Sequence, residues 1–192
     1  MIGKKNIVFG FLYLVLTAAL GPVMVSQLDE VGKAQGEKQA AFSELELLAS
    51  SGFENQQTLE KMSAEEIAKK NSAALLVLNK QLNARAPIDA IKGGPHTHGN
   101  LESVLNIAVG IVLCFIALKP LYKQVISWVF IAGTLLHSGM LYLVVVFQIP
   151  WAGQVLNTGI GPIMILVGLL LAGLASAFAF RGEFVRDTAT VI

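Results

Sequence analysis

The sequence contains one cysteine, Cys114, and three histidines, and it lacks the motifs of the common soluble enzymes. A single cysteine excludes an intrachain disulfide. The chain has no nucleophile elbow, phosphate loop or metalloprotease signature. Its charged part mixes both signs, which gives no indication of nucleic-acid binding. Any chemistry therefore depends on a small number of polar residues in an otherwise apolar sequence.

Long apolar runs dominate the composition. Hydrophobic residues make up 54% of the 192 residues, and the mean hydropathy is positive. Four runs are long enough to cross a hydrocarbon core of about 30 Å, although the second needs the polar turn before it. These runs are residues 7–25, 104–118, 125–147 and 160–180. The sequence therefore predicts an all-α protein with a bundle of four transmembrane helices in the lipid bilayer.

Basic residues flank the apolar runs on one alternating side, which predicts that this side faces the cytoplasm. They are Lys4, Lys5, Lys119, Lys123, Arg181 and Arg186. No small-x-small cleavage site follows Met24, so we expect the first run to be a retained anchor and not a signal peptide. We expect a multi-pass protein of a bacterial-type inner (plasma) membrane, with both termini in the cytoplasm and residues 28–94 outside it.

Residues 28–94 are polar, with eight basic and ten acidic residues. An amphipathic helix is predicted from about Leu28 to Ala49, and Ser63 with Glu66 forms a capping box before a second helix. The stripe of this second helix is Ile67, Leu75, Leu78 and Leu82. Ala86-Pro87 and Gly93-Gly94-Pro95 are expected to end the segment. The sequence thus predicts an extracytoplasmic helical hairpin inserted between transmembrane helices 1 and 2.

Two Gly-Pro pairs, at Pro22 and Pro162, lie in the first and fourth apolar runs. Proline removes a backbone donor, so each pair predicts either a bend or a helix start. The fourth run also carries small residues at four-residue spacing, which allow close packing on another helix or another subunit. They are Gly168, Ala172 and Ser176, with Gly173 and Ala177 alongside.

The candidate site residues lie on the second and third predicted helices. His96 and His98 stand where the water-facing segment meets the second helix, and Glu102 is an acidic residue inside that helix. His98, Glu102 and Asn106 follow each other at four-residue spacing and should form one polar face. The third helix carries His137 near mid-membrane and Tyr142 nearer the outer side. Ionisable residues inside a membrane helix predict a functional site unless they only form structural hydrogen bonds.

Three chemistries fit these residues. A haem would take one axial imidazole and leave its sixth position free, whereas an electron-transfer haem would take a second axial ligand from the remaining histidines. A non-haem metal such as copper or another transition metal would need three or four ligands, which the His-x-His pair and Glu102 could supply. The third possibility is a structural or accessory subunit without any cofactor.

A short pattern runs from His96 through Leu101 and Ile107-Ala108-Val109 to Leu141-Tyr142-Leu143, which follows Gly139. From His96 to Phe147 the chain resembles the styrene oxide isomerase family of small four-helix membrane enzymes that bind haem b. The resemblance implies that His96 is the axial haem ligand and that Tyr142 is the active-site phenol. It also implies a trimer, a small hydrophobic substrate, and isomerisation of an epoxide to an aldehyde by ferric haem acting as a Lewis acid.

The sequence departs from this family at several positions. The pocket asparagine of the family falls on Glu102, its acidic residue on Thr134 and the neighbouring asparagine on Ser138. His98 and His137 are additional, and the hairpin is not a family feature. We therefore expect Glu102, His137 and Tyr142 to be catalytic, and His96, His98 and Asn106 to bind the cofactor. The alternative is a haem or metal subunit for electron transfer or assembly, without catalysis.

The expected domains are transmembrane helix 1 (residues 1–27), the hairpin (28–94), and transmembrane helices 2–4 with the haem site (95–192).

Overall fold

A computed structural model describes residues 1–55, 58 and 60–187 of the chain, and these residues form helices without any β-strand. Contacts divide the chain into two compact units, one of Met1–Pro22 with Ala90–Ile192 and one of Val23–Asp89. Four helical stretches are long and apolar enough to cross a membrane: Gly3–Ser26, Ala64–Phe115, Pro120–Val145 and Ile160–Ala179. The predicted all-α class is confirmed, and so is the presence of four helical stretches that are long and apolar enough to cross a membrane.

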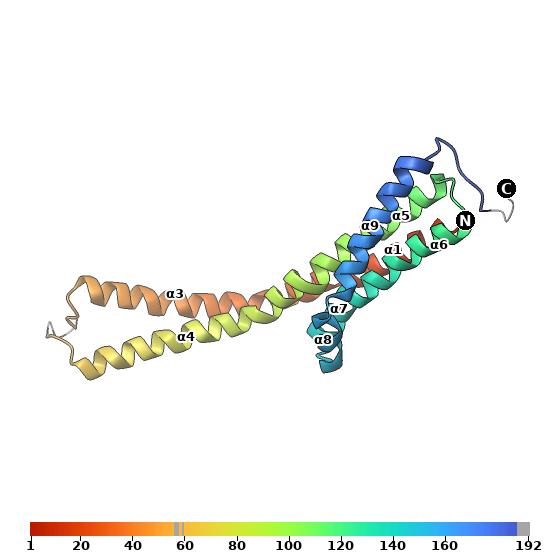
Figure 1. The fold of residues 1–192 in the computed structure, drawn as a ribbon. Helices are drawn as coiled ribbons and strands as arrows, with labels where there is room; N and C mark the ends of the chain where they lie inside the picture. The colour runs from red at the N-terminus through yellow and green to blue at the C-terminus, as the bar shows by residue number, and fades with distance from the viewer. Residues whose placement is uncertain (56–57, 59, 188–192) are drawn as a thin grey trace. The chain divides into compact units, whose positions relative to one another are not determined.

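Helices α1 (Gly3–Ala18), α5 (Thr97–Phe115), α6 (Pro120–Thr134) and α9 (Ile160–Ala179) form the first unit and lie side by side (Figure 1). The polar turn before residue 104 belongs to α5, as the short second apolar run required. The third apolar run is divided into α6, a π-helical turn η2 (Leu135–Gly139) and α7 (Met140–Val145). A short helix, α8 (Pro150–Asn157), precedes α9.

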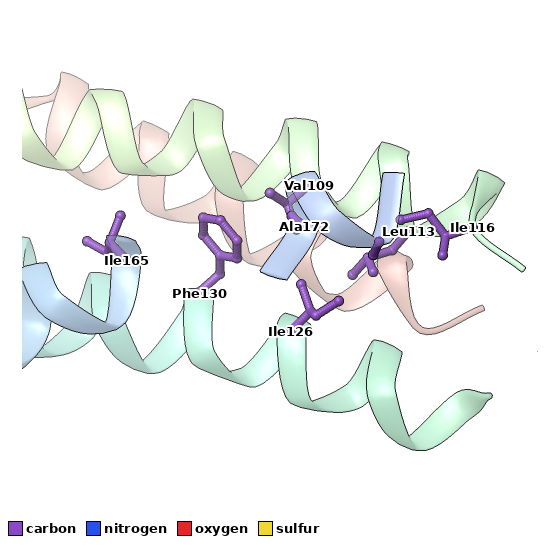
Figure 2. Close-up of a cluster of buried hydrophobic side chains, with 8 residues drawn as sticks. Val109, Leu113, Ile116, Ile126, Phe130, Ile165 and Ala172 are labelled. Atoms are coloured by element: carbon purple, nitrogen blue, oxygen red, sulfur yellow. The ribbon is translucent and has the colours of Figure 1, made fainter. Parts of the chain in front are cut away.

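The core of this unit is an apolar cluster between α5, α6 and α9 (Figure 2). Leu113, Ile116 and Phe130 are almost completely buried in it. Burial of such side chains stabilises a bundle mainly through close packing, because lipid tails are as apolar as the side chains themselves. The remaining members of the cluster are Val109, Ile126, Ile165, Ala172 and Ala175.

Only some of the small residues of α9 pack against the rest of the described chain. A Cβ added at Gly168 would lie 2.9 Å from the ring of Phe130, so α9 approaches α6 closely at this point. Ala172 is buried on the same face, whereas Gly173 and Ala177 are exposed and a Cβ at Gly173 would meet nothing within 4 Å. The small residues were predicted to pack on another helix or on another subunit. Gly168 and Ala172 pack on another helix of the same chain.

The two Gly-Pro pairs have different effects. α1 ends at Ala18, and α2 (Leu20–Ser26) begins after a one-residue break, because Pro22 cannot donate to the carbonyl four residues earlier. Pro162 instead stands in the first turn of α9, where its missing N–H costs nothing. The residue before this helix, Gly159, has φ +67°, which favours glycine. The first pair therefore marks a break and the second a helix start.

The second unit contains α3 (Leu28–Ser50) and most of α4 (Ala64–Ile91). The capping box is confirmed, since the Ser63 backbone N–H donates to Glu66 at 2.8 Å and the Glu66 N–H donates to the Ser63 hydroxyl at 3.2 Å. The exposed ion pairs Lys70–Glu44 and Lys80–Glu37 join α4 to α3.

Two expectations for α4 were wrong. Pro87 lies inside the helix and does not end it, whereas the break expected at Gly93-Gly94-Pro95 is present as a kink at Gly94, whose φ of −106° and ψ of −110° are not helical. This kink lies in the π-helical turn η1 (Lys92–His96). Leu75 and Leu82 of the predicted stripe are exposed, whereas Ala74 and Gln81, each one residue earlier, are buried.

The basic residues that were predicted to face the cytoplasm gather at one end of the first unit. Arg181 follows α9, and its backbone N–H donates to the Phe115 carbonyl at the end of α5. Lys5 at the start of α1 donates to Gln124 on α6. Lys123 is not exposed to solvent as a flanking lysine usually is. Its side chain is fully buried and donates to Asp187 at 2.7 Å.

Close packing of α1 on α5 generates a first prediction. A Cβ at Gly110 would lie 2.7 Å from the Gly3 carbonyl oxygen and 2.9 Å from the Ile7 backbone nitrogen, so Gly110→Ala forces the helices apart. We expect the free energy of unfolding in detergent to fall by about 1–3 kcal/mol. Gly173→Ala is the matched control, because its new methyl group meets open space. Equal stability of the two variants would contradict this packing.

The buried Lys123–Asp187 pair generates a prediction on pH. Burial raises the pKa of Asp187, but hydrogen bonds from Lys123 and from the Ile2 backbone N–H lower it below its ordinary value overall. A lowered folded-state pKa stabilises the fold above the ordinary value of about 3.9, and this contribution is lost as the pH falls through the folded-state pKa.

The variant Asp187→Asn tests this contribution. At pH 7 we expect the free energy of unfolding to fall by about 1.5–3 kcal/mol, the usual contribution of a hydrogen bond to a charged group. The difference between wild type and variant should disappear in acid below the folded-state pKa. A difference that stays constant from pH 7 to pH 3 would show that the pair does not titrate as described.

Candidate functional site

One face of α5 carries the acidic residue of the site. His98, Glu102 and Asn106 stand at successive four-residue intervals, so their side chains lie above one another along the helix. Glu102 is 4% exposed and Asn106 is fully buried, while His98 is partly exposed. The polar face that the sequence predicted on this helix is therefore turned into the bundle.

The π-helical turn η2 faces α5 across the site and carries His137 and Ser138. Such turns place one extra residue in a helix and often occur at functional sites, because they redirect side chains. Gly161 of α9 approaches this turn closely, and a Cβ there would lie 2.6 Å from the His137 backbone nitrogen. The packing of α9 thus fixes the backbone from which His137 extends.

Glu102 of α5 contacts η2 through both of its carboxylate oxygens. Its Oε1 lies 2.5 Å from His137 Nδ1, and its Oε2 accepts a hydrogen bond of 2.6 Å from the Ser138 hydroxyl. The ring of His98 lies edge-on to that of His137, with 4.8 Å between the centroids. A charged residue inside a membrane span is costly unless it is paired, and these contacts provide that pairing.

Three residues offer potential metal ligands at this point. One ligand atom each from His98, Glu102 and His137 lies within 4.8 Å of the others. Two imidazoles and a carboxylate suit zinc, iron and copper, and three protein ligands leave further coordination positions open. The sequence predicted that histidines and a carboxylate from two adjacent helices converge. The structure brings His98, Glu102 and His137 together in this way.

Asn106 links three helices below this cluster. Its amide donates to the Glu102 carbonyl at 3.0 Å and to the Thr134 hydroxyl at 2.8 Å, and its oxygen accepts from Asn6 of α1 at 3.1 Å. Asn6 in turn contacts Ser127 of α6. The polar groups of the Asn106 side chain are therefore engaged by the protein itself, and its predicted role in binding a cofactor stays a prediction.

The sequence reasoning missed the contribution of the first helix, which it treated only as an anchor. The Tyr13 hydroxyl lies 3.1 Å from the Ser138 hydroxyl, and Asn6 and Thr17 are fully buried polar residues. Their spacing contained a signal, since Gly3, Asn6, Gly10, Tyr13 and Thr17 alternate at three and four residues and form the buried face of α1. The polar face of α5 meets a polar face of α1.

His96 faces α1. Its Nδ1 lies 3.0 Å from the Thr17 carbonyl oxygen, and because a carbonyl only accepts, Nδ1 carries the hydrogen and donates. The imidazole is therefore left with a lone pair on Nε2. A metal-bound histidine commonly donates its other ring N–H to a backbone carbonyl, so His96 fits an axial haem ligand by this criterion. The two histidines of the His-x-His pair contact different helices.

Tyr142 stands on α7, where its ring centroid lies 5.7 Å from that of Phe147. Leu141 and Val145 of the same helix lie 3.9 and 3.7 Å from a Cβ added at Gly94, which stands two residues before His96. The helix that carries Tyr142 thus packs beside the segment that carries His96. The predicted catalytic role of this phenol stays a prediction.

Comparisons of this chain with protein-family models, with curated proteins and with solved structures found no match. The function therefore has to be inferred from the chemistry of the site.

Proposed function

We propose that this chain is an integral membrane protein that binds one transition-metal ion through His98, Glu102 and His137. The observation that supports the proposal is the donor set, with one ligand atom from each residue within 4.8 Å of the others. Imidazole and carboxylate donors of this number are typical of catalytic zinc and of non-haem iron, both of which keep open positions for water or substrate.

The surroundings favour a cation at this point. Glu102 is 4% exposed in a helix that is apolar enough to span a membrane, so a metal ion would supply a counter-charge to its carboxylate. His137 Nδ1 and Glu102 Oε1 lie 2.5 Å apart, and an ion bound to both of these atoms would replace the contact between them. The metal would supply Lewis-acid or redox chemistry, while the chain orients the carboxylate and excludes bulk water.

The proposed orientation follows from the clustered basic residues, since positive charge is enriched at cytoplasmic ends. Both termini would lie in the cytoplasm, and residues 28–94 would form a helical hairpin outside it. The ion pairs between α3 and α4 support the antiparallel hairpin, because Glu44 pairs with Lys70 and the earlier Glu37 with the later Lys80. A small hydrophobic substrate would reach the ion on the side where His98 and His137 are partly exposed.

A second candidate is a haem b protein with His96 as axial ligand, as the resemblance to styrene oxide isomerases implies. The observation that favours it is the hydrogen bond from His96 Nδ1 to the Thr17 carbonyl, which leaves Nε2 for iron. Tyr142 would lie near the open face, and haem would supply Lewis-acid chemistry for an epoxide substrate. A trimeric assembly belongs to this candidate.

The metal proposal is tested by purifying the protein in mild detergent and titrating it with Co²⁺ and Zn²⁺. We expect about one ion per chain, with affinity lowered by at least about a hundredfold in His98→Ala, Glu102→Gln and His137→Ala. Loss of a direct ligand should exceed the tenfold-to-hundredfold cost of losing an outer partner. His96→Ala is the matched control and should keep the ion. Wild-type protein that binds neither metal would end this proposal.

The haem candidate makes the opposite prediction for the same variants. After expression with added haem precursor, the wild type should show a Soret band that shifts when imidazole is added, because the sixth position is open. His96→Ala should lose the haem, whereas His137→Ala should keep it and Tyr142→Phe should keep it with altered ligand binding. A colourless wild-type preparation would rule the haem candidate out, and retained haem in His96→Ala would move the ligand elsewhere.

A further inference from the structure

Ser138 stands between the carboxylate of the site and the first helix. Its hydroxyl is fully buried, lies 2.6 Å from Glu102 Oε2, and lies 3.1 Å from the Tyr13 hydroxyl. Tyr13 is 7% exposed, so bulk water does not compete for this contact. The three side chains come from three different helical segments, α1, α5 and η2.

The direction of these hydrogen bonds follows from counting protons. A serine hydroxyl has one hydrogen, and Ser138 has two acceptors within reach, Glu102 Oε2 at 2.6 Å and the Thr134 carbonyl at 3.2 Å. The carboxylate oxygen is nearer and the stronger acceptor when ionised, so it takes the hydrogen. Tyr13 must then donate to Ser138, which gives a chain from Tyr13 through Ser138 to Glu102.

These hydrogen bonds give the two oxygens of the Glu102 carboxylate different roles. Oε2 is held by Ser138, while Oε1 faces His137 at 2.5 Å and keeps a further lone pair. We propose that Tyr13 and Ser138 are positioning residues of the metal centre, which fix Glu102 so that it binds the ion through Oε1 alone. The inference rests on the proposed metal site and adds the first helix to it.

Close packing explains why α1 can hold this position. A Cβ at Gly10 would lie 2.7 Å from the Ser103 carbonyl oxygen, and a Cβ at Gly99 would lie 2.3 Å from Thr17 Cγ2. Tyr13 lies between Gly10 and Thr17, so its backbone is fixed against α5 on both sides. The hydroxyl therefore reaches Ser138 from a rigid helix.

The test measures Co²⁺ affinity and the visible absorption of bound Co²⁺, which depends on coordination geometry. We expect Ser138→Ala to weaken binding about tenfold to a hundredfold and to shift the spectrum, because the carboxylate is free to rotate and bind through both oxygens. Tyr13→Phe should have a smaller effect of the same kind, since Ser138 still donates. Ser138→Thr, which keeps a hydroxyl, should restore wild-type affinity and spectrum.

The matched control is Ser103→Ala. Ser103 is also a fully buried serine of the first unit, and its hydroxyl donates to the carbonyl four residues earlier in its own helix at 2.6 Å. Its loss should leave Co²⁺ affinity unchanged.

Three outcomes would overturn the inference. Wild-type affinity and spectrum in Ser138→Ala and Tyr13→Phe would end the positioning role and leave the metal centre intact. An equal loss in Ser103→Ala would reduce the effect to general packing. Wild-type protein that binds no Co²⁺ would overturn the metal centre together with this inference.

Discussion

A carboxylate inside a membrane-spanning helix has to be neutralised or fully hydrogen-bonded, and much of this bundle is arranged around that constraint. Glu102 meets it through His137 and Ser138, which share one π-helical turn. A regular α-helix would place adjacent residues about 100° apart, and the wider turn helps both side chains reach the same carboxylate. The conformation of η2 is thus linked to the charge that it contacts.

Glycines in α1 and α9 allow these helices to pack closely against α5 and η2. Gly161 lets α9 press on the backbone of η2, and Gly10 lets α1 press on α5. Without a hydrophobic force between helices in lipid, such close approach and the hydrogen bonds across it are what hold a bundle together. Asn106 shows the result, since a single amide links α1, α5 and α6. Packing and polar contacts therefore stabilise the same helix pairs.

The sequence predicted the features that depend on one helix at a time. Apolar length identified the four membrane-crossing stretches, the capping box fixed the start of α4, and four-residue spacing identified the polar face with Glu102.

Features that need two helices were harder to predict. Tyr13 is an ordinary interfacial or core residue until Ser138 lies beside it, and Lys123 is an ordinary flanking lysine until Asp187 reaches it. Pro87 was misread because a proline disrupts only contacts to the preceding turn, which α4 tolerates.

The two histidines of the His-x-His pair differ in what they can do, because each contacts a different neighbour. Residues two positions apart on a helix point about 200° apart, so His96 reaches α1 while His98 reaches His137. The cluster of potential metal ligands contains His98, Glu102 and His137, and His96 does not belong to it. The non-haem and haem candidates therefore use different histidines and are not two descriptions of one centre. Glu102 belongs with His98 and His137, and its position makes the non-haem donor set the better supported of the two.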